Sequence, residues 1–127
     1  MRILIDTHVL IWYLNGDDNL SQKLVRIIED ETNIIVISTA RLWEIAIKLS
    51  SGKVGFEIAL SEIEKYINEK DVELLNIDFQ SLTVLAQLPY HHRDPFDRLL
   101  IAQAISQNAS IISADRHFTT YAVDVIW

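Results

Sequence analysis

The stretch Asp94-Pro-Phe-Asp97-Arg-Leu-Leu-Ile-Ala-Gln-Ala104 has the pattern of a helix that begins at Asp94 and is apolar on nearly every side. Asp94 suits the N-cap, the proline suits the first helical position, and Asp97 lies in the first turn, where the helix dipole favours a carboxylate. On their own, both acids are explained by this structural role. A helix with hardly any polar face packs against a sheet in the interior of a protein, and we expect that position here.

Short apolar runs alternate with helical patterns along the rest of the chain. Buried strands are predicted at residues 2–6, 34–37, 72–77, 110–115 and 123–127, and helices at 8–14, 20–29, 40–50, 57–70 and 79–88, with the last helix ending near residue 107. The alternation predicts an α/β fold with a central, mostly parallel, twisted sheet covered by helices on both faces. At 127 residues, we expect a single domain, residues 1–127.

The composition narrows the setting of the protein. There is no cysteine, which excludes disulfides and thiolate metal sites and fits a reducing compartment. Asp6 and His8 interrupt the N-terminal apolar run, so it does not have the pattern of a signal peptide. No uncharged apolar stretch approaches the roughly 18 residues needed to cross a bilayer. We therefore expect a cytoplasmic protein that is not associated with a membrane.

The charge balance is acidic, with 18 acids against 11 basic residues and a formal net charge of −7. Taken alone, this balance argues against a nucleic-acid partner, because the phosphate backbone attracts Lys and Arg. Acids gathered in one cleft can instead hold divalent cations, which then receive a phosphate group. The placement of the acids therefore decides between these readings.

Five acids are expected at one edge of the predicted sheet. Asp6 and Asp115 end strands, Asp94 and Asp97 open a helix, and Glu44 lies early in the helix after the second strand. The C-terminal ends of parallel strands and the starts of the following helices share an edge, which is where α/β proteins bind ligands. We therefore expect these carboxylates to meet.

Each of these acids also has an ordinary structural explanation. Asp6 can cap the helix that follows it, and Asp115 can be a turn residue. Glu44 stands in an apolar setting, where it needs a cation, a hydrogen-bond network or a raised pKa, and an ion pair with Lys48 four residues later is one solution. Five separate coincidences on one rim are a poor explanation, and clustered carboxylates repel unless cations or protons compensate them.

An all-oxygen cluster favours Mg²⁺ or Mn²⁺ over zinc. Mg²⁺ usually takes one or two carboxylates and keeps several waters, which leaves positions for phosphate oxygens. The chemistry that suits such a site is metal-assisted hydrolysis of a phosphodiester, in which the ion lowers the pKa of an attacking water.

Four segments resemble the motifs of PIN-domain ribonucleases, most closely the VapC toxins of toxin–antitoxin systems. They are Ile-Leu-Ile-Asp6-Thr-His-Val-Leu-Ile-Trp, Leu-Trp-Glu44-Ile-Ala-Ile-Lys, His-Arg-Asp94-Pro-Phe-Asp97-Arg-Leu-Leu-Ile-Ala-Gln-Ala and Ser-Ala-Asp115-Arg-His-Phe. The resemblance implies a compact three-layer α/β/α sandwich, commonly dimeric, that cleaves RNA with Mg²⁺ or Mn²⁺ and is paired with a cognate antitoxin.

The resemblance also assigns roles to single residues. Asp6, Glu44 and Asp97 match the principal metal ligands, Asp115 completes the site, and Asp94 is a possible fifth acid. Ser113 matches a position where the family often has a hydroxyl group, and it is a further candidate for contact with RNA. Five cationic residues near the motifs are candidates for a basic rim that holds RNA: Arg41, Lys48, Arg93, Arg98 and Arg116.

Two further expectations concern a pair of histidines and the partner of the acidic cleft. His91 and His92 are adjacent in a polar loop, and we expect them to be solvated, because neighbouring side chains diverge. An acidic cleft is a target for an Arg or Lys from the antitoxin, which can displace the metal or compete with RNA.

Two other functions fit parts of the pattern. A phospho-acceptor receiver domain also binds Mg²⁺ at strand ends, but it resembles this chain less. It needs an acidic pair after the first strand, a lone acceptor Asp after the third and a late Lys, where this chain has Asp6 alone, Asp78-Phe79 and Ser113-Ala114. The second alternative is a PIN-domain nuclease that processes RNA without a toxin role.

Overall fold

The computed structural model describes residues 1–52 and 57–127 of the chain. Its centre is a sheet of five strands: β1 (Arg2–Ile5), β2 (Ile34–Ser38), β3 (Glu73–Leu75), β4 (Ser110–Ile112) and β5 (Val125–Ile126). Their order is β3-β2-β1-β4-β5, and every pairing among the described strands is parallel. The predicted parallel sheet is confirmed, with β1 in the middle, between β2 and β4.

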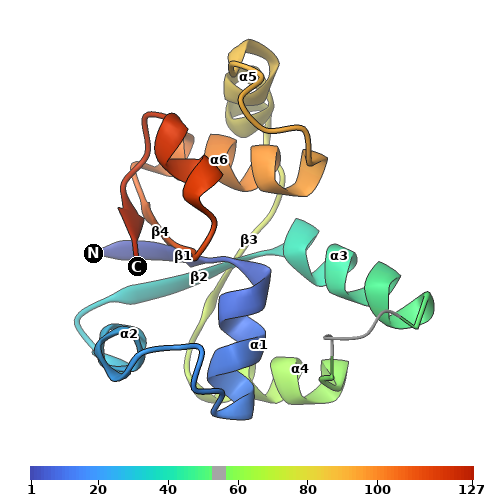
Figure 1. Cartoon of the computed structure of the whole chain (residues 1–127), viewed down its shortest axis with the longest axis vertical. Helices are drawn as coiled ribbons and strands as arrows, with labels where there is room; N and C mark the ends of the chain where they lie inside the picture. Colours follow the sequence, from blue (N-terminus) through green and yellow to red (C-terminus); the bar gives the residue numbers. More distant parts are fainter. Residues whose placement is uncertain (53–56) are drawn as a thin grey trace.

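Helices cover both faces of this sheet (Figure 1). They are α1 (Thr7–Asn15), α2 (Gln22–Glu29), α3 (Thr39–Ser50), α4 (Leu60–Glu69), α5 (Phe79–Gln87) and α6 (Pro95–Gln107), followed by the 3₁₀ turn η1 (Arg116–Thr120). In the view of Figure 1, α1, α2 and α4 lie below the sheet and α5 and α6 lie above it. The three-layer α/β/α sandwich is thus confirmed.

Alternation along β1 explains why two cores form. Ile3 and Ile5 point to the side of α1, α2 and α4, whereas Leu4 points to the side of α6. Successive strand residues face opposite sides of a sheet, so a strand that is apolar at every position must be covered on both faces. All of β1 except Arg2 is buried, as expected for the middle strand.

The helix predicted from the opening stretch forms as expected. Asp94 is its N-cap, with Oδ1 accepting from the backbone N–H groups of Phe96 (2.8 Å) and Asp97 (3.1 Å), and Pro95 is the first helical residue. Residues 98–104 are all buried, because α6 packs against the sheet on one side and α5 on the other. The helix ends at Asn108, whose φ of 52° is the left-handed conformation common at helix C-termini.

Element boundaries differ from the predictions by a few residues. The helix predicted from residue 20 begins at Gln22, because Ser21 is its N-cap and accepts from the N–H of Leu24 at 3.3 Å. The strand predicted at 72–77 is limited to Glu73–Leu75, the length over which it pairs with β2. Among the described residues, no helix has the length and apolar character that a bilayer span requires.

Candidate active site

Asp6 lies at the C-terminal end of β1, where the chain turns into α1. Its Oδ1 accepts from the N–H of Thr7 at 2.7 Å, so the predicted cap exists. Its Oδ2 accepts from the hydroxyl of Ser113, which follows the neighbouring strand β4, at 2.7 Å. Hydrogen bonds from two elements therefore fix the orientation of this buried carboxylate.

Glu44 lies on α3 with only 4% of its surface exposed. Its Oε1 accepts from the Thr7 hydroxyl at 2.8 Å and from Arg41 Nη1 at 2.7 Å, and its Oε2 accepts from Lys48 Nζ at 2.9 Å. Burial raises the pKa of Glu44, but Arg41, Lys48 and Thr7 together outweigh burial and hold this pKa below its usual value. The predicted pair with Lys48 is present, as one part of a larger network.

Asp97 points from the first turn of α6 towards the end of β1. Its Oδ1 accepts from Arg41 Nη2 at 2.6 Å, and its Oδ2 lies 3.0 Å from His92 Nε2. Burial raises the pKa of Asp97 above its usual value, and the nearby charges of Asp6 and Asp94 add to this, despite the opposing effect of Arg41.

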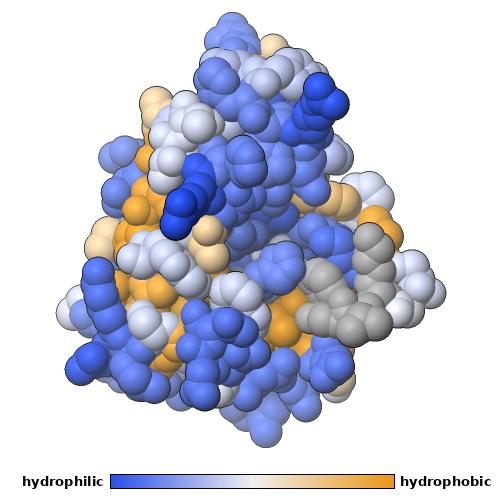
Figure 2. Space-filling model, viewed as in Figure 1, coloured by the Kyte–Doolittle hydropathy of each residue, from blue (hydrophilic) through white to orange (hydrophobic). Residues whose placement is uncertain are grey.

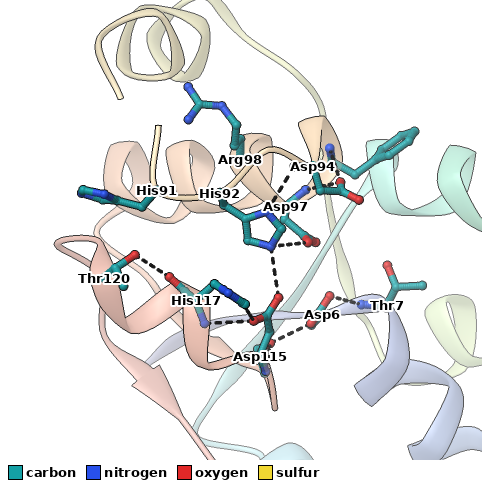
Figure 3. Close-up of polar contacts among 12 residues, drawn as sticks. Asp6, Thr7, His91, His92, Asp94, Asp97, Arg98, Asp115, His117 and Thr120 are labelled. Carbon is teal, nitrogen blue, oxygen red and sulfur yellow. Dashed lines mark hydrogen bonds and ion pairs between the residues drawn. The ribbon is translucent and has the colours of Figure 1, made fainter. Parts of the chain in front are cut away.

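Asp115 follows β4 and caps η1. Its Oδ1 accepts from the backbone N–H of His117 and lies near His117 Nδ1, both at 2.9 Å, and its Oδ2 lies 3.1 Å from His92 Nε2. Burial raises the pKa of Asp115, but the hydrogen bonds from His117 and His92 outweigh it, so this pKa is lowered. Figure 3 shows the His92 ring between Asp97 and Asp115.

The acids predicted to meet do line one hollow, of about 410 Å³, at the C-terminal edge of the sheet. Hydrophilic residues gather across this part of the surface, between α6 and α1 (Figure 2). The lining includes all five predicted acids, together with cationic and aromatic side chains: Asp6, Glu44, Asp94, Asp97, Asp115, Arg41, Lys48, His8 and Trp12. Asp94 is therefore both a helix cap and part of the lining.

Arg41 does not lie on an exposed rim, and that prediction is wrong. The residue is 2% exposed, and its guanidinium forms ion pairs with Asp6 (3.1 Å), Glu44 (2.7 Å) and Asp97 (2.6 Å). Three carboxylates draw the side chain inward from α3. The signal in the sequence was its position three residues before Glu44, which places both side chains on one face of a helix.

Arg98 and Ser113 were also predicted to contact RNA, and both are buried. Arg98 is 5% exposed and donates to the carbonyls of Pro89 (2.8 Å) and Leu88 (3.2 Å), so it ties the loop before α6 to that helix. Ser113 donates to Asp6 and accepts from the N–H of Asp115 at 3.0 Å. Its hydroxyl orients two acids, and it is not on the surface that RNA would reach.

The remaining cationic candidates keep positions compatible with their predicted role. Arg93 and Arg116 are exposed, next in the chain to Asp94 and Asp115 respectively. Lys48 is partly exposed at the edge of the hollow, where it pairs with Glu44. Their contact with RNA stays a prediction.

His92 was expected to be solvated, and this expectation is wrong. Its Nδ1 accepts from the backbone N–H of Asp94 at 3.1 Å, so in the neutral ring Nε2 carries the proton. That N–H points at Asp97 and Asp115, which makes His92 a donor to two acids of the site. His91 is exposed, as predicted. The sequence held one clue, since His92 lies two residues before the cap of α6.

The residues of the hollow fit a divalent cation. Five acids and two cationic side chains, Arg41 and Lys48, line the hollow, so the ionised site with neutral histidine has three more negative than positive charges. Carboxylate oxygens are the donors that Mg²⁺ and Mn²⁺ prefer. Among the described residues, His92, Asp115 and His117 are also close enough together to hold a metal ion, and His92 Nε2 contacts Asp97 and Asp115 here.

Comparison with known families agrees with this arrangement. The family profile of the PIN domain matches residues 3–124, which is almost the whole chain. The chain belongs to the PIN domain family. No curated protein sequence matches it.

Solved structures show how closely this PIN domain follows known folds. It resembles a chain of VapBC2 from Rickettsia felis, crystallised with a promoter DNA fragment, with 16% identity over 100% of this chain and 99% of that chain and a TM-score of 0.78. A chain of DNA-bound VapBC from Salmonella typhimurium is 18% identical over 99% of this chain and 97% of that chain, with a TM-score of 0.75. A chain of VapBC-5 from Mycobacterium tuberculosis is 18% identical over 98% of this chain and 95% of that chain, with a TM-score of 0.57. At these identities the likeness establishes the fold.

Proposed function

We propose that this PIN domain is a Mg²⁺- or Mn²⁺-dependent endoribonuclease that acts as the toxin of a toxin–antitoxin pair. The observation that carries the proposal is the meeting of Asp6, Glu44, Asp97 and Asp115, from four separate parts of the chain, at one hollow. A divalent ion held there would lower the pKa of an attacking water and stabilise the charge that develops on a phosphodiester.

The protein's own residues have distinct tasks in this proposal. Asp6, Glu44 and Asp97 would be the principal ligands of the ion, and Asp115 would complete the site. Ser113 orients the Asp6 carboxylate through the contact at 2.7 Å. Water would attack phosphorus and give up one proton to solvent, while the bond from phosphorus to the leaving oxygen breaks and that oxygen takes a proton from solvent. Arg93 and Arg116 are exposed and are next in the chain to Asp94 and Asp115, which supports a role in pairing with phosphates of the RNA.

The toxin role is supported by the solved structures that this chain resembles. Two of them are VapBC assemblies bound to DNA. By analogy, the partner of this chain is a cognate antitoxin, and the proposed assembly is a homodimer of the nuclease with antitoxin chains. The excess of carboxylates at the hollow suits an Arg or Lys from such a partner. The PIN match leaves an RNA-processing nuclease as the alternative and removes the receiver domain.

Cleavage of a panel of structured RNAs tests the nuclease assignment. We expect cleavage with Mg²⁺ or Mn²⁺, none with EDTA, and little with Asp97→Asn. Glu64→Gln, an exposed acid on α4 far from the hollow in sequence, is the matched control and should cleave normally. Undiminished cleavage by Asp97→Asn in EDTA would end the metal-nuclease proposal.

Expression in cells separates a toxin from a processing enzyme. The wild-type chain alone should arrest growth, whereas Asp6→Asn, or co-expression with the neighbouring open reading frame, should allow growth. Normal growth with the active wild-type nuclease would refute the toxin role and favour RNA processing.

A further inference from the structure

Arg41 occupies the centre of the candidate site, and the proposed chemistry gives it no task. It is 2% exposed, and among its partners are three of the four site acids. A buried arginine is uncommon unless it is paired, and here each partner is an expected ligand or neighbour of a metal ion.

Arg41 contacts oxygen atoms of two carboxylates that are expected to be principal ligands of the ion. Nη2 lies 3.1 Å from Asp6 Oδ1 and 2.6 Å from Asp97 Oδ1, so one nitrogen bridges the two principal acids. Each carboxylate oxygen has a second lone pair that a divalent ion can use. A guanidinium at these distances, however, places positive charge beside the ion and weakens its binding unless the guanidinium moves. The other oxygen of Asp6 accepts from the hydroxyl of Ser113, so each oxygen of that carboxylate already has a hydrogen-bond donor.

The framework of the protein does not otherwise hold the guanidinium in place. Among the described residues, Arg41 Nε is buried and finds no hydrogen-bond acceptor, which costs free energy. Arg98, the other buried arginine near the site, contrasts with it, because its guanidinium is bound to backbone carbonyls. Attraction to the carboxylates therefore accounts for the position of Arg41.

We propose that Arg41 is a built-in cation that neutralises the site in the metal-free protein and competes with the divalent ion for Asp6 and Asp97. The inference rests on the proposed function in one respect, since it takes the hollow as a metal site. By linkage, interactions that stabilise only the metal-free arrangement must weaken metal binding by the same free energy. The more Arg41 stabilises the metal-free protein, the weaker the binding of the metal ion becomes.

The test compares Arg41→Met with Arg98→Met at neutral pH. Calorimetric titration with Mn²⁺ alone gives the affinity, and urea unfolding in EDTA gives the stability of the metal-free protein. We expect Arg41→Met to be less stable without metal yet to bind Mn²⁺ at least about tenfold more tightly, a change of about 1.4 kcal/mol. Arg98→Met should also lose stability, but its Mn²⁺ affinity should equal that of the wild type, because its guanidinium contacts no site acid.

The outcomes are distinguishable. Equal or weaker Mn²⁺ binding by Arg41→Met would overturn this inference and leave the metal site intact. No Mn²⁺ binding by either the wild type or Arg41→Met would overturn the metal site itself, and with it the proposed function. If Arg41→Met does not fold in EDTA, Arg41→Lys replaces it, because a lysine keeps the charge but cannot bridge the acids as a guanidinium does. Tighter binding by Arg41→Lys supports the inference, and unchanged binding refutes it.

Discussion

Replacing Glu44 by Gln removes one charge from the site and keeps nearly the same shape. In the wild type the carboxylate accepts from Thr7, Arg41 and Lys48 at 2.7–2.9 Å while almost fully buried. An amide has one acceptor oxygen, and its NH₂ group faces at least one of these donors. The variant therefore loses charge-assisted hydrogen bonds that it cannot replace.

The structure sets the size of the loss. A hydrogen bond to a charged group contributes about 1.5–3 kcal/mol, and breaking a buried ion pair costs about 3–5 kcal/mol. Arg41 keeps Asp6 and Asp97 as partners, and Lys48 is partly exposed, so the cost lies below the sum of two such losses. We expect Glu44→Gln to lower the free energy of unfolding by about 2–4 kcal/mol near pH 7, or the melting temperature by roughly 10 °C in a chain of this size.

The pH dependence of this loss has a definite sign. The folded-state pKa of Glu44 is lowered from 4.5, so its ionised form adds stability at any pH above the unfolded-state value. That stability disappears as the pH falls below about 4.5 and through the lowered pKa. The difference between wild type and variant should therefore be constant from pH 8 to pH 5 and shrink below that.

Urea or thermal unfolding with EDTA present, followed by circular dichroism, measures the stability difference between wild type and Glu44→Gln at several pH values from 3.5 to 8. A variant as stable as the wild type at pH 7 would refute the network around Glu44. A deficit of the same size at both ends of the pH range would show that shape, and not charge, accounts for the loss.

The other predictions concern the remaining polar groups of the site. Asp97→Asn should be neutral or stabilising in EDTA at pH 7, because the pKa of Asp97 is raised from 3.8 and its ionised form therefore costs stability. Unfolding curves should show that this gain in stability disappears as the pH falls towards 3.8. A loss of stability at pH 7 would contradict the prediction. Mn²⁺ at about 100 times its dissociation constant should stabilise the wild type by about 2.7 kcal/mol, and a melting temperature unmoved by Mn²⁺ would argue against the site. Ser113→Ala should lower the free energy of unfolding by about 1–3 kcal/mol and reduce cleavage, because the Asp6 carboxylate loses a hydrogen bond. Ser106→Ala should leave cleavage unchanged, because the Ser106 hydroxyl donates to the carbonyl of Gln103.

The sheet and the meeting of the acids could be predicted because they depend on local patterns. Asp94 and Pro95 mark the start of α6 through capping and backbone geometry, which act within a few residues. Apolar runs that end on Asp6 and Asp115 mark parallel strands, whose C-terminal ends must share an edge. These rules place side chains on elements and elements in layers, and they require no knowledge of tertiary contacts.

The cationic residues could not be placed by the same rules. Arg41 and Arg98 were assigned to a basic rim because they lie near the site motifs in the sequence, but charged side chains can be buried when they are paired. Each is buried by partners distant in sequence, since Arg41 reaches Asp97 across 56 residues and Arg98 reaches carbonyls of the preceding loop. The orientation of a flexible side chain depends on what the fold brings near it. The spacing of Glu44 and Lys48 predicted one such contact in advance, and the spacing of Arg41 and Glu44 was an unused signal for a second one.

The same contacts change what the acid cluster means for stability. Clustered carboxylates were expected to repel one another, and such repulsion raises pKa values. The pKa of Asp97 is raised, but the pKa values of Glu44 and Asp115 are lowered. The difference follows from the balance between burial and hydrogen bonds, since Arg41, Lys48 and Thr7 outweigh burial at Glu44, and His117 and His92 outweigh it at Asp115. Two nitrogen atoms also bridge pairs of acids: Arg41 Nη2 bridges Asp6 and Asp97, and His92 Nε2 bridges Asp97 and Asp115. Asp97 takes part in both bridges, yet burial still dominates its pKa. The acids are therefore held close together before any ion binds, and the cost of their charge is concentrated at Asp97, the carboxylate with the most to gain from a divalent cation.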